Sequence, residues 1–262
     1  MSFSIAGKTA IVTGAANGIG LAIARHFAEQ GASVMFADTD EARLIDEVGE
    51  AAQTEGPIRY FTCDLREKLG HANLVSATLD AFERIDILVN AARAMAPSEP
   101  LNPDADAVDD MLRINLMSGL RLSQLVAKRM IRQAEDAGQT EGQAGSIVNL
   151  SSIAARRTHP GLLGYSVATA ALEQAIRSLA VALAPYRIRV NAVAPGSVMS
   201  ASLREMLKDR PAYRDEIIGH TPMARIAPPT ELAEAVQFLA SEGAGFVTGQ
   251  VLSVSGGLTM AG

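Results

Sequence analysis

The feature that most constrains this chain is a regular alternation of short apolar runs with longer segments of helical periodicity. The runs are rich in Val and Ile and apolar on both faces, which is typical of buried parallel strands. We expect strands at Thr9–Val12, Ser33–Ala37, Ile58–Cys63, Ile85–Val89, Ser146–Leu150, Ile188–Val193 and Val251–Val254. Helices are expected near Ile19–Gln30, Glu41–Gln53, Leu69–Phe82, Asp106–Arg132, Gly164–Ala184 and Thr230–Ala240. Because the alternation never breaks, we predict one α/β domain over residues 1–262, a doubly wound parallel sheet with helices on both faces.

One long segment interrupts this rhythm near the C-terminal end. Residues 196–229 follow the expected strand Ile188–Val193, and open α/β sheets bind ligands beyond the carboxyl ends of their strands. Long connections inside a compact domain are usually functional. We therefore expect residues 196–229 to form a substrate lid, with a small helical insertion as the alternative.

Composition argues against several classes of partner. The net charge of −6 lacks the basic balance that nucleic-acid binding needs, so no nucleic-acid partner is expected. No apolar stretch approaches the roughly 18 residues of a membrane span, and the first residues show no signal-peptide pattern. A cytoplasmic protein without a membrane partner is the expectation. The four histidines are not spaced as metal ligands, and Cys63 is single, so we expect no metal and a buried core thiol rather than a nucleophile.

A glycine-rich turn, Thr13–Gly20, lies between the first expected strand and the first expected helix. Glycines let a backbone turn sharply and approach a pyrophosphate closely, and a helix N-terminus offers free N–H groups to phosphates. The placement of this turn predicts a dinucleotide site. Its binding residues are expected to be Gly14, Asn17, Gly18, Ile19 and Gly20.

Two acidic residues follow the next two strands. Asp38 is placed to accept hydrogen bonds from the adenosine ribose hydroxyls and to repel a 2′-phosphate. The nearest basic residue after it is Arg43, so we predict NAD rather than NADP; the alternative is that Asp38 only caps the next helix, a role that Asp40 also suits. Asp64, with Leu65 beside it, is a candidate acceptor for the adenine amine or an ordinary strand-end turn residue.

Further motifs complete a match to a known family. The landmarks, in chain order, are Thr13–Gly20, Asp38, Asp64, Asn90–Ala92, Asn115, Ser151–Ser152, Tyr165, Asn191 and Pro195–Gly196. Over essentially its whole length the chain resembles the compact, single-domain short-chain dehydrogenases/reductases. The resemblance implies a Rossmann-type domain with a seven-stranded parallel sheet and a nicotinamide cofactor. It also implies a homo-oligomer, most often a tetramer, that pairs the helices Asp106–Arg132 and Gly164–Ala184.

The same resemblance assigns roles to individual residues. Ser152 holds the substrate oxygen, Tyr165 exchanges the proton, and Asn115 belongs to a water chain behind the active site. The remaining cofactor contacts that it implies are Asn90, Ala91, Ala92, Tyr165, Pro195, Gly196 and Val198. The roles suit hydride transfer, which needs a nicotinamide fixed against the substrate carbon and a proton donor or acceptor at the substrate oxygen.

The main departure from the family pattern is a missing lysine. The family pairs its tyrosine with a lysine four residues later, and here that position holds Thr169. The lysine binds the nicotinamide ribose, and its charge favours the phenolate form of the tyrosine. A free tyrosine has a pKa of about 10, so without that charge we expect slow alcohol oxidation at neutral pH. Returning a lysine by Thr169→Lys would be expected to speed oxidation about ten- to a hundredfold.

A second departure places an arginine beside the cofactor site. Where the family has Asn-Asn-Ala-Gly, this chain has Asn90-Ala91-Ala92-Arg93. The Arg93 guanidinium is expected to reach the pyrophosphate or ribose and partly replace the missing cation. The alternative is an outward-pointing surface arginine.

We therefore predict an NAD(H)-dependent oxidoreductase that interconverts a secondary alcohol and a ketone. The alternative is a catalytically weak or inactive NAD-binding protein of the same fold, acting as a sensor or structural partner, which Thr169 favours. An apolar substrate is expected from a set of apolar residues that suit a pocket or lid, although they also suit a core: Leu162, Leu163, Met199, Leu203, Met206 and Leu207.

Overall fold

The computed structural model describes residues 3–49, 52 and 54–260. Within these ranges seven strands pair into one sheet, all in parallel, in the order β3-β2-β1-β4-β5-β6-β7. The strands are β1 (Thr9–Thr13), β2 (Ser33–Asp38), β3 (Ile58–Thr62), β4 (Ile87–Asn90), β5 (Gly145–Leu150), β6 (Ile188–Pro195) and β7 (Val251–Val254). The predicted doubly wound sheet is confirmed, and its strand order reverses between β1 and β4.

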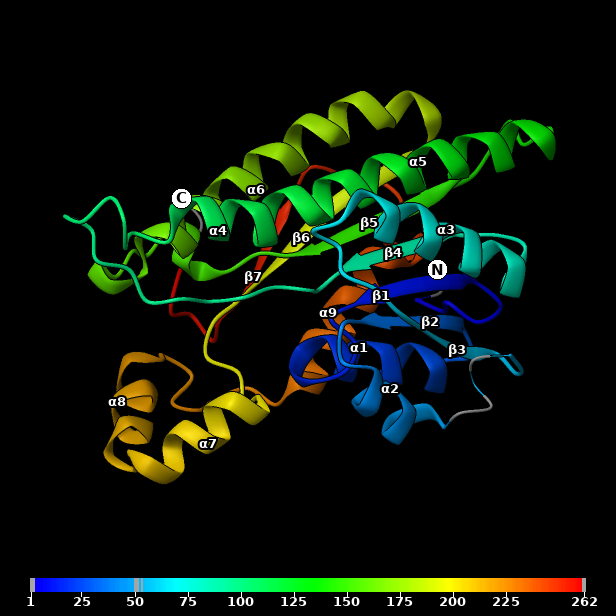
Figure 1. Ribbon diagram of the computed structural model, residues 1–262. Helices are drawn as coiled ribbons and strands as arrows, with labels where there is room; N and C mark the ends of the chain where they lie inside the picture. The colour runs from blue at the N-terminus through cyan, green and yellow to red at the C-terminus, as the bar shows by residue number, and fades with distance from the viewer. Residues whose placement is uncertain (1–2, 50–51, 53, 261–262) are drawn as a thin grey trace.

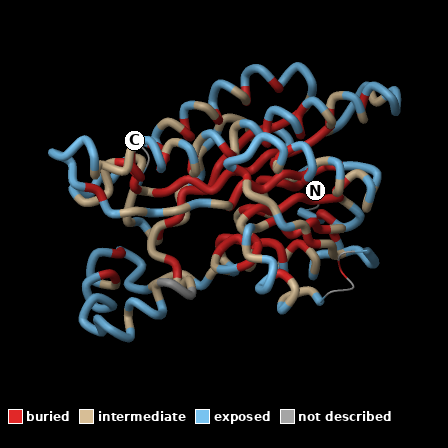
Figure 2. The backbone as a smooth tube through the Cα atoms, viewed as in Figure 1, coloured by how far each residue is buried: buried red, intermediate tan, exposed pale blue. Residues whose placement is uncertain are grey.

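Helices cover both faces of the sheet (Figure 1). They are α1 (Gly18–Glu29), α2 (Glu41–Val48), α3 (Lys68–Phe82), α4 (Val108–Met111), α5 (Ser118–Asp136), α6 (Leu163–Leu183), α7 (Ala201–Asp209), α8 (Ala212–His220) and α9 (Pro229–Ala240). Helices α1, α2 and α9 lie on one face, and α3, α5 and α6 lie on the other. Figure 2 shows the buried residues concentrated along the sheet between these two layers.

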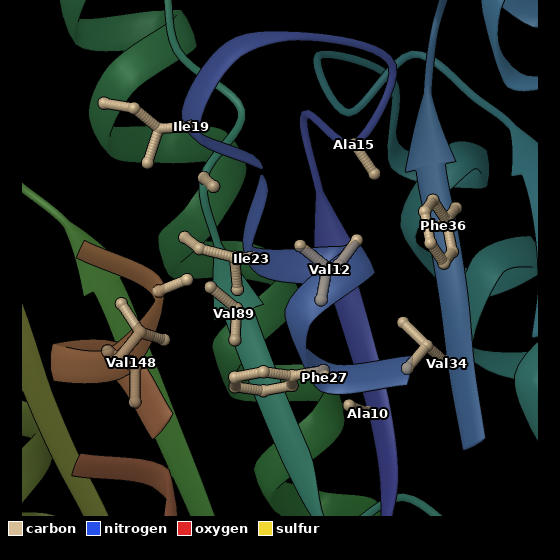
Figure 3. Close-up of a cluster of buried hydrophobic side chains, with 14 of the residues drawn as sticks. Ala10, Val12, Ala15, Ile19, Ile23, Phe27, Val34, Phe36, Val89 and Val148 are labelled. Atoms are coloured by element: carbon tan, nitrogen blue, oxygen red, sulfur yellow. The ribbon is translucent and has the colours of Figure 1, made fainter. Parts of the chain in front are cut away.

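The central strands are apolar throughout because their successive side chains enter two different cores. Val12 of β1 packs in the core beneath α1, whereas its neighbour Ile11 packs in the core beneath α5 and α6. In Figure 3, Ile23 and Phe27 of α1 lie beside Val12. Both α1 side chains are fully buried, and each burial contributes about 1.5–3 kcal/mol. A strand buried on both faces cannot show the alternation of polar and apolar residues that a half-exposed strand shows.

Two predicted helices differ from those observed, each for a local reason. The helix from Glu41 ends at Val48, because Gly49 adopts a φ of +82° that ends the helix. Residues 50, 51 and 53 of its predicted range lie outside the described residues. The predicted helix Asp106–Arg132 is instead α4 and α5 joined by a π-helical segment, Leu112–Met117, which holds Asn115. π-helical turns are frequent at functional sites.

The segment between β6 and α9 forms two short helices, α7 and α8, so the alternative of a helical insertion describes its structure. Figure 1 shows these helices set apart from the two helical layers, and Figure 2 shows them mostly exposed. A bridge between Val198 and Ala227 joins the two ends of the insertion. Its far end is held by the N–H of Met223, which donates to the Gly256 carbonyl at 3.0 Å.

One described helical segment, Pro160–Tyr186, is long and apolar enough to cross a membrane, with a mean hydropathy of 1.3. This corrects the expectation that no apolar stretch approaches that length. In the fold, Leu172 and Ile176 of this segment are buried in the core beneath α6. Core helices of folded domains have the same length and composition, so the segment carries no argument for a membrane.

A buried arginine holds the C-terminus of α9 against the sheet. Arg189 of β6 is only 6% exposed, and burial lowers the pKa of its guanidinium to about 10. The guanidinium donates to the carbonyl oxygens of Leu239 and Ser241 at 2.7 and 2.9 Å, and to Gln143 Oε1 at 2.7 Å. These carbonyls end α9, where a helix leaves its last C=O groups without partners and favours a positive charge.

We predict that Arg189→Met lowers the free energy of unfolding by about 3 kcal/mol, because it removes the hydrogen bonds of the buried guanidinium, including both that it donates to Gln143 Oε1, while keeping most of the side-chain volume. Urea denaturation measures the change. The matched control is Arg43→Met, since Arg43 pairs with Asp40 at 3.3 Å on the surface and such pairs contribute less than about 1 kcal/mol. Equal losses in the two variants would contradict the prediction.

Candidate active site

A cavity of about 670 Å³ opens where the strand order reverses between β1 and β4. Ligands of open α/β sheets bind at such a switch point. Eleven of the predicted site residues line this cavity: Gly14, Asn17, Gly18, Ile19, Gly20, Asp38, Asp64, Leu65, Ala91, Ala92 and Tyr165. The structure therefore brings residues from five separate parts of the sequence to one wall, and their roles in binding remain predictions.

The glycine-rich turn needs its glycines for steric reasons. Gly14 and Gly18 have φ values of +67° and +59°, which L-residues rarely adopt. A Cβ on Gly14 would lie 2.8 Å from Ala92 Cα, and a Cβ on Gly20 would lie 2.1 Å from the Gly14 carbonyl oxygen. Gly18, in contrast, borders the open cavity, where an added Cβ would meet nothing within 4 Å.

The start of α1 fits a phosphate group. Asn17 is the N-cap residue, and its side chain makes no capping hydrogen bond, so it leaves the first N–H groups of the helix to other acceptors. The first turn of α1 contains no acidic residue. A smooth glycine cradle beside a helix N-terminus suits the diphosphate of a dinucleotide, which supplies the hydride chemistry when it is bound.

Asp38 joins the end of β2 to the glycine-rich turn. Its Oδ2 accepts a hydrogen bond from the Ala16 N–H at 3.0 Å, and its Oδ1 accepts one from the Thr39 N–H at 2.7 Å. Asp40, not Asp38, caps α2, by accepting from the Arg43 N–H at 3.2 Å. Asp40 therefore caps the helix, which was the alternative role considered for Asp38, and Asp38 lines the cavity.

Arg66 is a cavity residue that the sequence analysis missed. Its Nε and Nη2 donate to Asp64 Oδ2 at 2.9 and 2.6 Å, and this pairing lowers the pKa of the Asp64 carboxyl. The carboxylate must share its acceptor capacity between Arg66 and any adenine amine. A basic residue two positions after a strand-end aspartate was the available signal for the ion pair.

Cys63 differs from its predicted position. It is half-buried on the cavity wall rather than deep in the core. Burial raises the pKa of its thiol to about 12, and the charges of Asp38 and Asp64 add to the effect.

Tyr165 lines the same cavity as Asp38 and Asp64. It opens α6, is 4% exposed, and packs with Met111, Ala154 and Ala168. Its hydroxyl accepts a hydrogen bond from Arg93 Nη1 at 3.2 Å. The ring is therefore held in an apolar cluster while the oxygen faces a cation.

Ser152 lies two residues after the end of β5 and outside the cavity wall. Its Oγ accepts a hydrogen bond from the Ala154 N–H at 3.1 Å and so caps a short 3₁₀ turn, Ile153–Ala155, which packs against α6. A serine hydroxyl has one hydrogen to donate, and this contact leaves that hydrogen free for another acceptor.

Asn115 uses both ends of its amide on one neighbour. Its Nδ2 donates to the Ala94 carbonyl at 2.9 Å, and its Oδ1 accepts from the Ala94 N–H at 2.9 Å. The π-helical segment therefore clamps the loop that follows β4. A water that bonds the side-chain oxygen of Asn115 would use the second lone pair of Oδ1.

Four other predicted residues also lie outside the cavity wall: Asn90, Pro195, Gly196 and Val198. Asn90 Nδ2 donates to Ser123 Oγ and Asn149 Oδ1, both at 2.9 Å, which ties β4 to α5 and β5. Gly196 packs so closely that an added Cβ would lie 2.9 Å from Ser255 Cα. These residues support the site from behind or form the base of the insertion.

Thr169 does not replace the missing lysine. It is 2% exposed, and its Oγ1 donates to the carbonyl oxygens of Tyr165 and Ser166 at 2.9 and 3.1 Å. This back-bonding within α6 uses the hydroxyl hydrogen, so Thr169 brings neither charge nor donor to the cavity. The cation beside Tyr165 comes instead from Arg93, which lines the cavity.

A glycine cradle at the switch point of a parallel sheet, with a tyrosine hydroxyl in the same cavity, defines a dinucleotide-binding α/β enzyme. Comparisons with known proteins narrow this class. A family model described as enoyl-(acyl carrier protein) reductase matches residues 14–259. The 7α-hydroxysteroid dehydrogenase of Escherichia coli (strain K12) is 34% identical over 251 residues, covering 96% of this chain and 94% of that protein.

Two further matches agree. The cis-4-hydroxycyclohexanecarboxylate dehydrogenase of Sinomonas cyclohexanicum is 36% identical over 261 residues and covers 99% of each chain. A solved structure of a 7α-hydroxysteroid dehydrogenase, complexed with NADH and 7-oxo glycochenodeoxycholic acid, has a TM-score of 0.87 and 33% identity, covering 97% of this chain and 95% of that one. The chain belongs to the short-chain dehydrogenase/reductase family. It is an oxidoreductase that interconverts a secondary alcohol and a ketone with a nicotinamide dinucleotide.

The raised pKa of Cys63 predicts slow alkylation. With a pKa near 12 instead of 9.0, the thiolate fraction at pH 8 falls roughly a thousandfold, and only the thiolate reacts. Native protein should react with iodoacetamide at pH 8 several hundredfold more slowly than protein unfolded in urea, as measured by mass spectrometry. Cys63 is the single cysteine of the chain, so Cys63→Ser provides the blank. A native rate within tenfold of the unfolded rate would contradict the shift.

Proposed function

We propose that the protein is an NAD(H)-dependent oxidoreductase in which Tyr165 exchanges a proton with the oxygen of an apolar secondary alcohol or ketone. The observation that carries the proposal is that Tyr165 lines the same cavity as the glycine-rich turn and Asp38. A cofactor held by the turn extends along this cavity toward the tyrosine. Ser152, whose hydroxyl hydrogen is free, supports the substrate oxygen, and Asn115 fixes the loop that borders the site.

The preference for NAD over NADP rests on charge at the adenosine end. Asp38 presents a carboxylate to the cavity, and a 2′-phosphate there would be repelled. Of the basic residues nearby, Arg66 pairs with Asp64, and Arg43 pairs with Asp40. Each cation is thus already neutralised by a carboxylate, and neither is free to take up a phosphate.

An apolar substrate is supported by the residues around the insertion. Leu203 and Leu207 of α7 are half-buried, and Met206 is 41% exposed, so they leave apolar surface on the insertion. We propose that residues 196–229 act as a lid that closes this surface over the substrate. Two relatives are named for hydroxyl groups on carbon rings, a 7α-hydroxysteroid and cis-4-hydroxycyclohexanecarboxylate. An alicyclic secondary alcohol, or its ketone, is the substrate class that we propose.

We further propose a cytoplasmic homotetramer. Helices α5 and α6 leave apolar side chains exposed, among them Leu125, Val167 and Val181, the last of which is 78% exposed. Self-complementary apolar faces favour closed symmetric assemblies. A monomer found by light scattering at micromolar concentration would exclude the tetramer.

The alternative of an inactive sensor on the same fold is less well supported. It draws on Thr169, which brings no charge to the site. The contact between Arg93 and Tyr165 supplies a cation at that place by another route. Measured turnover of an alicyclic alcohol with NAD⁺ separates the two functions.

We predict that Asp38→Asn lowers the ratio of the NADPH dissociation constant to the NADH dissociation constant by about tenfold. The substitution removes one negative charge beside the 2′-position and keeps a carbonyl acceptor for the Ala16 N–H. Titration calorimetry measures both constants. Asp40→Asn is the matched control, since Asp40 caps α2 outside the cavity wall, and its ratio should not change. Tighter binding of NADPH than NADH by the unaltered protein would contradict the assignment.

We predict that Tyr165→Phe lowers kcat/KM by at least about a hundredfold in both directions, because it removes the proton donor and keeps the ring that packs with Met111 and Ala154. The assay follows NADH absorbance with cyclohexanols, hydroxysteroids and their ketones. Circular dichroism and NADH binding should remain close to those of the unaltered protein. Retained turnover would remove Tyr165 from the chemistry.

A further inference from the structure

We propose that Arg93 supplies, from the loop after β4, the positive charge that keeps Tyr165 ready to accept a proton. The proposal rests on the proposed function of Tyr165 as acid and base. Arg93 Nη1 donates to the Tyr165 hydroxyl at 3.2 Å and to the Ser151 carbonyl at 3.4 Å. One nitrogen thus contacts both the reacting oxygen and the end of β5.

The backbone on both sides of Arg93 is held by hydrogen bonds and close packing, so the contact between Arg93 and Tyr165 starts from a fixed position. On one side, Ala92 donates its N–H to Thr13 Oγ1 at 3.1 Å. It also packs so closely against Gly14 that a Cβ on Gly14 would not fit. On the other side, Ala94 is clamped by both ends of the Asn115 amide. Arg93 therefore leaves the sheet from a position set by its two neighbours, and it lines the cavity.

The acceptor is held as firmly as the donor. Ser151 is fully buried; its N–H donates to the Val193 carbonyl at 2.9 Å, and its Oγ donates to Glu173 Oε1 at 3.1 Å. Glu173 in turn pairs with Arg156 at 3.2 Å. The Ser151 carbonyl is therefore a fixed second acceptor that directs the guanidinium toward Tyr165.

Many of the other charged side chains on α6 and on the elements packed against it have contacts elsewhere. Glu173 and Arg177 lie on α6 itself. On the short segments packed against α6, or within two residues of them, lie Asp106, Asp109, Asp110, Arg113, Arg156 and Arg187, and α5 and β6 add Arg121, Lys128, Arg129, Arg132, Glu135, Asp136 and Arg189. Arg156 and Arg177 both pair with Glu173. Asp106 accepts from the Val108 N–H, Arg113 pairs with Glu67, and Asp109 and Asp110 are exposed. His159 uses its Nδ1 to accept from the Gly161 N–H.

The charge has a defined task in the reaction. In oxidation, the alcohol C–H bond breaks as its electron pair passes to NAD⁺ as hydride, and the O–H proton passes to the Tyr165 phenolate, which leaves a ketone, NADH and a phenol. The phenolate that starts this step is stabilised by the adjacent guanidinium. A guanidinium does not lose its proton in the working pH range, so this stabilisation does not itself titrate.

This geometry changes the expectation for Thr169→Lys. A lysine at 169 would extend from α6 toward the same oxygen that Arg93 already contacts, and the two like charges would repel each other. We therefore expect no gain from Thr169→Lys alone. The gain should appear only when Arg93 is also replaced by the family's glycine.

A cycle of four proteins tests the proposal: the unaltered chain, Arg93→Gly, Thr169→Lys and the double variant. At pH 7, Arg93→Gly should slow oxidation about ten- to a hundredfold and move the pH profile of kcat/KM one to two units higher. The double variant should recover most of both losses. Arg157→Gly is the matched control, since Arg157 is exposed, bonds the Leu258 carbonyl and should leave the profile unchanged.

A second readout needs neither cofactor nor turnover. The chain has four tyrosines and no tryptophan, so ¹³Cζ-tyrosine labelling gives few NMR signals, and Tyr165→Phe identifies the one of interest. The chemical shift of this signal should change in Arg93→Gly and return in the double variant. Arg93→Gln, which keeps a donor without charge, should behave like Arg93→Gly and serves in its place if the glycine variant does not fold.

The outcomes distinguish a failure of the role proposed for Arg93 from a failure of the role proposed for Tyr165. If Tyr165→Phe abolishes turnover while Arg93→Gly moves neither the NMR signal of Tyr165 nor the pH profile of kcat/KM, Arg93 does not supply this charge and the proposal is overturned. If Tyr165→Phe keeps full turnover, the proposed function of Tyr165 fails instead.

Discussion

The site depends on how closely the turn after β1 packs against the end of β4. A Cβ on Gly14 would lie 2.8 Å from Ala92 Cα, so only glycine permits this approach. Thr13 Oγ1 accepts hydrogen bonds from the N–H groups of Ala91 and Ala92 and holds the same two segments together. One contact therefore shapes the phosphate cradle on one side and fixes the start of the β4–α4 loop on the other. The floor of the dinucleotide cavity and the position of Arg93 have a common origin.

The fold offers two positions from which a cation can reach the Tyr165 hydroxyl. One lies on α6, a single helical turn after the tyrosine, and is the position of the family's lysine. The other lies on the loop after β4, and Arg93 takes it here. In this chain the position on α6 holds Thr169, whose buried hydroxyl donates to a carbonyl oxygen of its own helix. A guanidinium is long and planar, so it can contact Tyr165 and the Ser151 carbonyl together from a more distant Cα.

The sequence predicted the sheet well because its signal is local: runs of Val and Ile buried on both faces have few other structures open to them. Asp38 and the glycine-rich turn were placed for the same reason, since each lies at a strand end. The contacts that define the chemistry are not local. Arg93 and Tyr165 are 72 residues apart, and only the packing of β4 beside β5 and α6 brings them together. The order of residues placed Arg93 beside the cofactor site, but it did not identify the Tyr165 hydroxyl as its partner.

The distance along the chain also changes what the tyrosine depends on. A lysine on the same helix is positioned by helix geometry alone, whereas Arg93 is positioned by the turn after β1 and by the Asn115 clamp on Ala94. The π-helical segment that presents Asn115 thus becomes part of the electrostatics of Tyr165, although the Asn115 side chain bonds the backbone of Ala94 and the Met111 sulfur rather than Tyr165 itself. Changes that loosen this clamp would reach the tyrosine through the loop. In this chain, the packing that shapes the cofactor cradle therefore also positions the charge at the proton-transfer site.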